Sequence, residues 1–190
     1  MKKIAMLSII TVIAYATAVC LFLIFKTEVL LTFWEISTIL SAYVVLCLVT
    51  QISKIGNTKF RKAIVRFTLG MAVFSTLAHI INLLITRPLI TAGHDIPTYF
   101  QIGYWFSTEM LMDYIGWGLC LGIAFILLFF SLKQTHKVLA ATSMIIGILC
   151  ILGFIGGMWN QNLWYFAPAG YGIGLMILCF EILLDKSFGD

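Results

Sequence analysis

The sequence predicts an all-α integral membrane protein, folded as a single bundle of six transmembrane helices. Hydrophobic residues make up 62% of its 190 residues and charged residues only 11%. A soluble domain has about 45–50% apolar and about 25% charged residues, and the mean hydropathy here is +1.06. The length allows one bundle and no separate soluble domain. No nucleotide-binding loop or nucleic-acid surface is recognisable, so we expect no nucleic-acid partner.

Six apolar runs are long enough to span a bilayer, which requires about 20 helical residues for a core of about 30 Å. They cover residues 4–25, 29–52, 63–86, 110–132, 138–158 and 163–184. Continuous apolar runs indicate helices, because the strands of a membrane barrel alternate apolar and polar positions. The connections are short except for a loop at about 87–109. Its aromatic stretch from Thr98 to Phe106 is interpreted as an interfacial or partly re-entrant helix.

The first run also has features of a signal peptide, because two lysines precede it and it contains Ala-x-Ala triplets at Ala14 and Ala16. However, its apolar residues continue through Phe25, which is long enough to span the membrane. We therefore interpret this run as the first transmembrane helix.

Basic residues predict the orientation of the bundle, because Lys and Arg concentrate in cytoplasmic loops. Only Lys26 and Arg87, two of the twelve basic residues, fall on one side of the predicted spans, and the other ten fall on the opposite side. Both termini are therefore expected in the cytoplasm, with the protein in the cell membrane.

The cysteines predict neither disulfides nor a metal site. All five lie inside apolar runs, and no CxxC pair occurs. Cysteines in such positions are small buried hydrophobes, and none has a Cys or His neighbour at ligand spacing. We expect no cofactor.

Strong polar groups gather in the predicted outer half of the bundle. They are Glu35, His79, Asn82, Glu109 and Asp113, together with the tryptophans Trp34, Trp105, Trp117 and Trp164. A carboxylate within a membrane span is costly and usually functional. Acids beside aromatic rings suit an organic cation. We therefore predict an outward-facing pocket that binds a small cationic or amphipathic ligand, in a transport component or a sensor.

Two other interpretations remain open. In the first, the protein is an intramembrane enzyme that acts on a lipid-like substrate, with His79 and Asp113 as acid and base. In the second, the protein is structural: the polar groups only bond the helices to one another, and the aromatic residues form the usual belt at the membrane interface. For Glu109 we also consider a role without function, as a solvated acid that is favoured at a helix N-terminus. A membrane-protein partner or a homo-oligomer is compatible with all of these.

The outline also has a counterpart among known proteins. Six spans, cytoplasmic ends, an outer-half pocket and the small-residue pair Ala14-x-x-x-Ala18 are similar to the substrate-binding membrane subunits of energy-coupling-factor vitamin transporters. This resemblance implies that an outer loop, here the one at 87–109, acts as a lid. It covers architecture and one spacing, without a motif specific to that family, and we assign no family from it.

Overall fold

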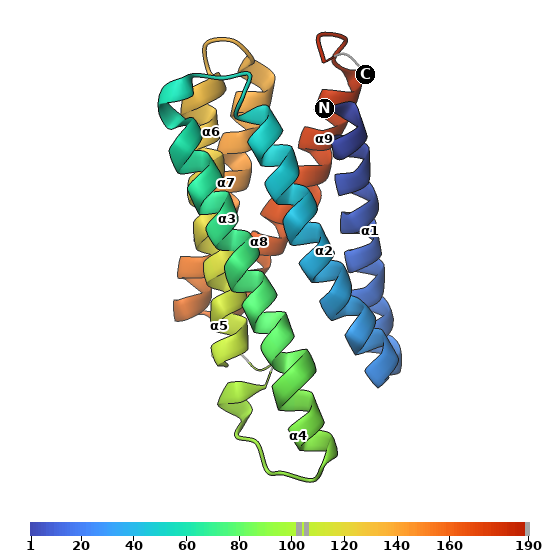
Figure 1. The fold of residues 1–190 in the computed structure, drawn as a ribbon. Helices are drawn as coiled ribbons and strands as arrows, with labels where there is room; N and C mark the ends of the chain where they lie inside the picture. The colour runs from blue at the N-terminus through green and yellow to red at the C-terminus, as the bar shows by residue number, and fades with distance from the viewer. Residues whose placement is uncertain (102–103, 105–106, 189–190) are drawn as a thin grey trace.

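The computed structural model describes residues 1–101, 104 and 107–188, and all the regular structure in this part of the chain is helical. Six helical segments are long and apolar enough to cross a membrane, as predicted. They cover Lys2–Phe25, Glu28–Ile52, Thr58–Thr91, Thr108–Leu132, Lys137–Trp159 and Gln161–Leu184. Figure 1 shows that both termini lie at one end of the bundle, here called the terminal end; the opposite end is called the far end.

The first two helices are joined by a two-residue turn at the far end. Helix α1 (Lys2–Phe25) ends where Lys26 adopts the left-handed conformation, with φ of 49°. Helix α2 (Glu28–Ile52) begins at once, because the Thr27 side chain accepts a hydrogen bond from the Leu30 N–H. This N-cap satisfies one of the backbone donors that a helix start leaves unpaired.

The third span is longer than the sequence predicted. It consists of α3 (Thr58–Ile81), the π-helical segment η1 (Asn82–Thr86) and α4 (Arg87–Thr91). The helix continues past the predicted end at residue 86 and through Pro88, because it widens just before this proline: the Arg87 N–H donates to the carbonyl of Asn82, five residues back. The wider turn makes room for the proline ring, which would otherwise clash with the carbonyl four residues earlier.

The fourth and sixth spans contain similar wide turns. The fourth consists of α5 (Thr108–Tyr114), the π-helical segment η3 (Ile115–Cys120) and α6 (Leu121–Leu132). Helix α7 (Lys137–Trp159) forms the fifth. The sixth consists of the 3-10 turn η4 (Gln161–Tyr165), α8 (Phe166–Pro168), the π-helical segment η5 (Ala169–Gly174) and α9 (Leu175–Leu184).

Because α4 extends the third span, the loop expected at 87–109 shortens to residues 92–107. Its described part contains one 3-10 turn, η2 (Thr98–Phe100), in the stretch where a longer interfacial helix was expected. Ile102, Gly103, Trp105 and Phe106 lie outside the described residues.

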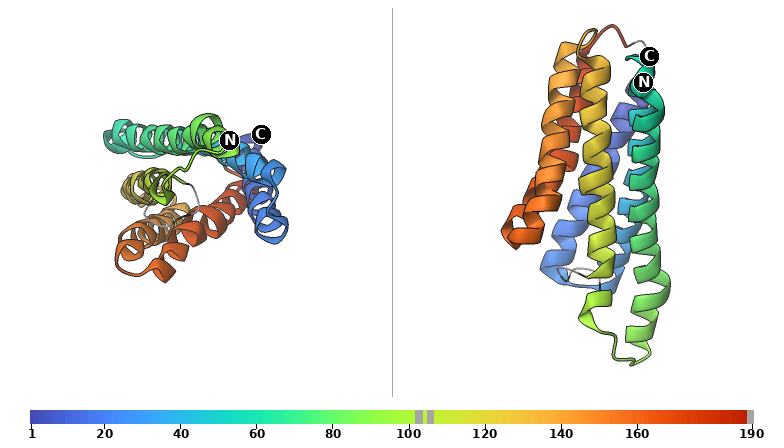
Figure 2. Two further views of the ribbon diagram at one scale, coloured as in Figure 1. Left: turned by 90° about the horizontal axis from the view of Figure 1, so that it is seen from below. Right: turned by 90° about the vertical axis from the view of Figure 1, so that its left-hand side faces the viewer.

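Successive helices pack side by side, and α1 closes the bundle by packing on α9 near the termini. Seen from below in Figure 2, α1 and α2 lie on one side of the bundle and α7 on the other. Toward the far end, α1 diverges from the sixth span (Figure 1). Small residues bring other helices close together: a side chain at Gly147 would meet the Gly122 carbonyl of α6, as expected for helix contacts in lipid.

The outer surface of the bundle is strongly apolar. Ile10, Leu23, Val29, Leu84 and Leu184 are examples of large hydrophobic side chains that are more than half exposed. Soluble monomers rarely expose such extensive apolar surface. Together with the six long apolar helices, this surface suggests a multi-pass membrane protein. All five cysteines are free.

Candidate functional site

A cavity of about 440 Å³ lies between α1, the fourth span and the start of the sixth span. It occupies the part of the bundle where α1 diverges from the sixth span. Its lining is mostly apolar and rich in aromatic rings, which include Tyr15, Trp34, Tyr114, Trp164, Tyr165 and Tyr171. Three of these rings are in contact, since Tyr114 stacks on Trp164 with ring centroids 5.9 Å apart, and Trp164 contacts Tyr165.

Asp113 supplies the charge of this cavity. Among the described residues, it is the only Asp, Glu, Lys or Arg in the lining. The Ser75 hydroxyl donates a hydrogen bond of 2.7 Å to its Oδ1 atom, and the Trp117 indole N–H donates to Ser75 Oγ at 2.8 Å. The chain from Trp117 through Ser75 to Asp113 fixes the carboxylate in place, and its side chain remains 15% exposed.

His79 also lines the cavity, one helical turn beyond Ser75 on α3. Its side chain is 1% exposed, and its Nε2 atom lies 3.6 Å from Asp113 Oδ1, which is beyond hydrogen-bond distance. Neither ring nitrogen has a hydrogen-bond partner within the described part of the chain. Buried polar groups are nearly always satisfied in native proteins. An unsatisfied imidazole at a cavity wall therefore marks a position where a bound molecule or water would be stabilised.

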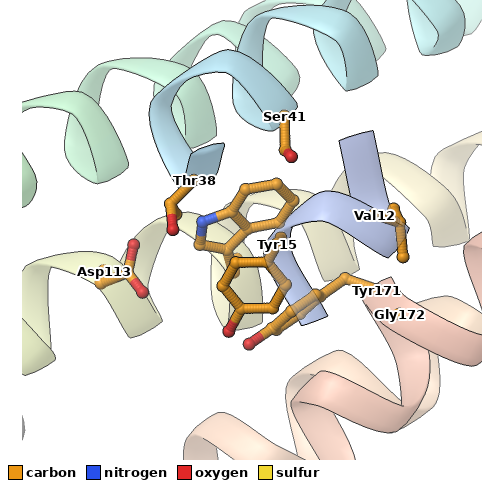
Figure 3. A pocket seen from close by; sticks show the side chains of 8 residues that line it. Val12, Tyr15, Thr38, Ser41, Asp113, Tyr171 and Gly172 are labelled. Carbon is orange, nitrogen blue, oxygen red and sulfur yellow. The ribbon is translucent and has the colours of Figure 1, made fainter. Parts of the chain in front are cut away.

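A second, smaller chamber adjoins the cavity and shares Val12, Tyr15, Asp113, Tyr171 and Gly172 with it. Its volume is about 20 Å³, enough for roughly one water molecule. Trp117 also lines it, and Thr38 and Ser41 complete the lining (Figure 3). The rings of Trp117 and Tyr171 lie 4.9 Å apart, and those of Tyr15 and Tyr171 lie 6.4 Å apart.

The wide helical turns all lie next to these groups. His79 precedes η1 by three residues, Asp113 precedes η3 by two, and Tyr171 lies inside η5. An added residue in a helical turn changes which side chains face inward, and π-helical turns occur frequently at functional sites. Three such turns beside one cavity therefore strengthen its assignment as the site.

Glu35 belongs to a different polar cluster. The Asn82 side-chain amide donates to its Oε1 atom, and Arg87 Nη1 donates to its Oε2 atom at 2.6 Å. Arg87 also pairs with Glu28 and accordingly joins the second and third spans. The Glu35 side chain is 0% exposed and fully paired. Neither Glu35 nor Asn82 is among the described residues that line the cavity.

Glu109 differs from the solvated acid that its position at a helix start suggested. It lies in the first turn of α5, but it is 1% exposed and accepts a hydrogen bond of 3.1 Å from Thr86. Its second oxygen has no partner among the described residues. The packing of α5 against the third span, which no local pattern encodes, removes this carboxylate from solvent.

The structure therefore brings together only some of the residues singled out from the sequence. Trp34, His79, Asp113 and Trp164 line the cavity, and Trp117 lines the chamber. Trp105 lies outside the described residues. Sequence reasoning missed Tyr15 and Tyr171. Interface belts place tyrosines near the ends of spans, so a tyrosine close to the middle of an apolar run was the available signal.

No group of three or more His, Cys, Asp or Glu side chains that could hold a metal ion occurs among the described residues. The site is instead an aromatic cavity with one buried imidazole and one carboxylate, in a helical bundle suited to a membrane. Comparison with protein-family models, curated proteins and solved structures finds no match.

Proposed function

We propose that the protein lies in the cell membrane with both termini in the cytoplasm, so that the far end of the bundle faces outward. The support is the charge asymmetry: Lys26 and Arg87 are the only two of twelve basic residues near the far end. We expect a fluorescent protein fused to the C-terminus to fluoresce in cells. An alkaline phosphatase fused at the same position should be inactive, because this enzyme is active only outside the cytoplasm. Active phosphatase with a dark fluorescent fusion would contradict this orientation.

We further propose that the cavity binds a small cationic or amphipathic ligand, for transport or sensing. The observation that carries this proposal is the position of Asp113, a carboxylate in an aromatic cavity of about 440 Å³. The arginine nearest to Asp113 in the sequence is Arg87, and it is paired with Glu28 and Glu35. An organic cation would neutralise Asp113 and pack against the aromatic faces. The cavity volume suits a small molecule.

The purely structural interpretation explains one cluster better than the other. Glu35, Asn82 and Arg87 satisfy one another and hold the second and third spans together, as interhelical polar contacts do. His79 and Asp113 line the cavity, and neither ring nitrogen of His79 has a hydrogen-bond partner among the described residues. Polar contacts that only hold helices together do not account for a cavity at this position.

An enzyme remains the second candidate, favoured by the 3.6 Å approach of His79 to Asp113 beside the cavity. An acid–base pair needs such proximity to a bound substrate. Conversion of lipid or isoprenoid substrates by the purified protein, abolished in His79→Ala, would favour this candidate over simple binding.

Substitution of Asp113 tests the binding proposal. We expect Asp113→Asn to weaken binding of 2-phenylethylamine, an aromatic ammonium ion, by at least about tenfold, because a charge-assisted contact contributes about 1.5–3 kcal/mol. Binding to purified protein in detergent micelles is measured by calorimetry. Glu28→Gln is the matched control, since it also removes one negative charge at the far end but lies outside the cavity. Equal affinity in wild type and Asp113→Asn would refute the proposal.

A further inference from the structure

We infer, on the basis of the proposed binding function, that the ligand is a primary ammonium compound with an apolar body. The ammonium group occupies the small chamber beside Asp113, and the body lies in the adjoining aromatic cavity. Three features lead to this assignment: the size of the chamber, the hydrogen-bonding character of its walls, and its connection to the larger cavity.

The chamber admits only a compact head group. Its volume of about 20 Å³ holds roughly one water-sized group, and an –NH₃⁺ group is of that size. A trimethylammonium group has three additional carbon atoms and exceeds it. The aromatic rings of Tyr15, Trp117 and Tyr171 surround this space, and they pack against one another, which limits how far the walls could give way.

The walls of the chamber offer hydrogen-bond acceptors. Ser75 and His79 both approach Oδ1 of Asp113. Within the described residues, no hydrogen bond engages Oδ2, and a ligand could bind that atom. The Thr38 hydroxyl donates its proton to the Trp34 carbonyl at 2.9 Å, and the Ser41 hydroxyl donates to the Thr11 carbonyl at 3.2 Å. With their protons committed to the backbone, these two hydroxyls present lone pairs as acceptors.

A primary ammonium is the guest that matches such walls. It carries one positive charge and three N–H donors, whereas a quaternary ammonium has no donor. The Trp117 indole N–H does not compete for Asp113, because it donates to Ser75. Among the described residues, no Lys or Arg lines the chamber or the cavity to neutralise the carboxylate.

The cavity that adjoins the chamber determines which body the ligand can carry. The chamber and the cavity share Asp113, Tyr15, Tyr171 and Gly172. The body of a ligand whose ammonium group occupies the chamber therefore extends into the cavity. There the lining offers aromatic and aliphatic side chains from α1, α5 and the sixth span. An arylalkyl or alkyl body of a primary amine would be buried against this lining.

Gly172 offers a way to block the site without removing its charge. It lines both spaces, and a Cβ atom placed there meets nothing within 4 Å. A larger side chain at this position therefore projects into open space rather than into neighbouring backbone. Gly172→Leu should fill the junction between chamber and cavity while Asp113 keeps its contacts.

The test compares four probes on the full-length protein in detergent micelles, with binding measured by calorimetry. They are 2-phenylethylamine, its N,N,N-trimethyl derivative, the neutral 2-phenylethanol, and sodium ion. We expect the primary amine to bind at least tenfold more tightly than each of the other three. Asp113→Asn should remove this preference, and Gly172→Leu should abolish amine binding. A melting temperature of Gly172→Leu close to that of wild type shows that this variant folds.

The outcomes separate this inference from the binding proposal. Equal binding of the primary and trimethylated amines overturns the chamber assignment but leaves a cation site in the wide cavity. Sodium binding as tight as that of the amine, lost in Asp113→Asn, assigns the chamber to an inorganic cation instead. Equal binding of amine and alcohol, or no binding of any probe to the folded protein, overturns both proposals. Unchanged amine binding in Gly172→Leu overturns the chamber assignment alone.

Discussion

Replacement of Arg87 by Met is expected to lower the free energy of unfolding by about 3–5 kcal/mol, because it leaves a buried charge unpaired. Glu35 is 0% exposed, and Arg87 Nη1 donates to its Oε2 atom at 2.6 Å. Without the guanidinium, the Asn82 amide is the one hydrogen-bond donor to this carboxylate that remains within the described part of the chain. Equilibrium unfolding in mixed micelles, followed by tryptophan fluorescence, measures the loss.

Two further variants isolate the buried pair. Glu28 contacts the same guanidinium but is 76% exposed, so Glu28→Gln should cost no more than about 1 kcal/mol. The double variant Arg87→Met, Glu35→Gln leaves no unpaired charge and should recover most of the lost stability. If the double variant is as unstable as Arg87→Met alone, the buried Glu35 charge is not the cause, and this account of the cluster fails.

Replacement of Gly153 by Ala is expected to be the most damaging change of packing. A Cβ atom there would lie 2.6 Å from the Cβ atom and 2.8 Å from the Cα atom of Ala167 in the sixth span. Rotamer changes cannot relieve a clash with backbone, so the two helices must separate, at a cost of about 1–3 kcal/mol. Separation of the helices would also move Tyr171 relative to the rings of Tyr15 and Trp117 that it contacts. The same unfolding measurement applies.

Gly172→Ala is the matched control for this prediction. It is the same substitution in the neighbouring span, at a position where the added methyl group meets nothing within 4 Å. We expect stability within about 0.5 kcal/mol of wild type, or slightly above it, since glycine is the weaker helix former. Equal losses in the two variants would show that close helix approach at Gly153 does not explain its effect.

The spans were predictable from the sequence because membrane insertion imposes a simple rule on composition. About twenty apolar residues in a row identify a spanning helix whatever its neighbours are, and five of the six predicted runs match their helices within a few residues. The third run was the exception. The predicted run ended at residue 86, but the π-helical segment before Arg87 and Pro88 let the helix continue to Thr91.

Only part of the site was predictable. Ser75, His79 and Asn82 are four and three residues apart on the third span, a spacing that places them on one helix face, and all three are buried. That spacing could not separate Asn82, which binds Glu35, from His79, which faces the cavity. The difference depends on the widened turn that begins at Asn82 and on the helices that pack against each side, neither of which is encoded in the periodicity.

By itself, the sequence determined the six long apolar helices, because the length of an apolar run is a local property of the chain. It also identified Asp113 and His79, because polar groups are rare in such spans. The tertiary structure decided how the acids are used. Glu35 is neutralised by Arg87, which is 52 residues away in sequence, whereas Asp113 faces an aromatic cavity that includes Tyr15 and Tyr171. Pairing and cavity formation depend on contacts between distant helices, and only packing establishes these contacts.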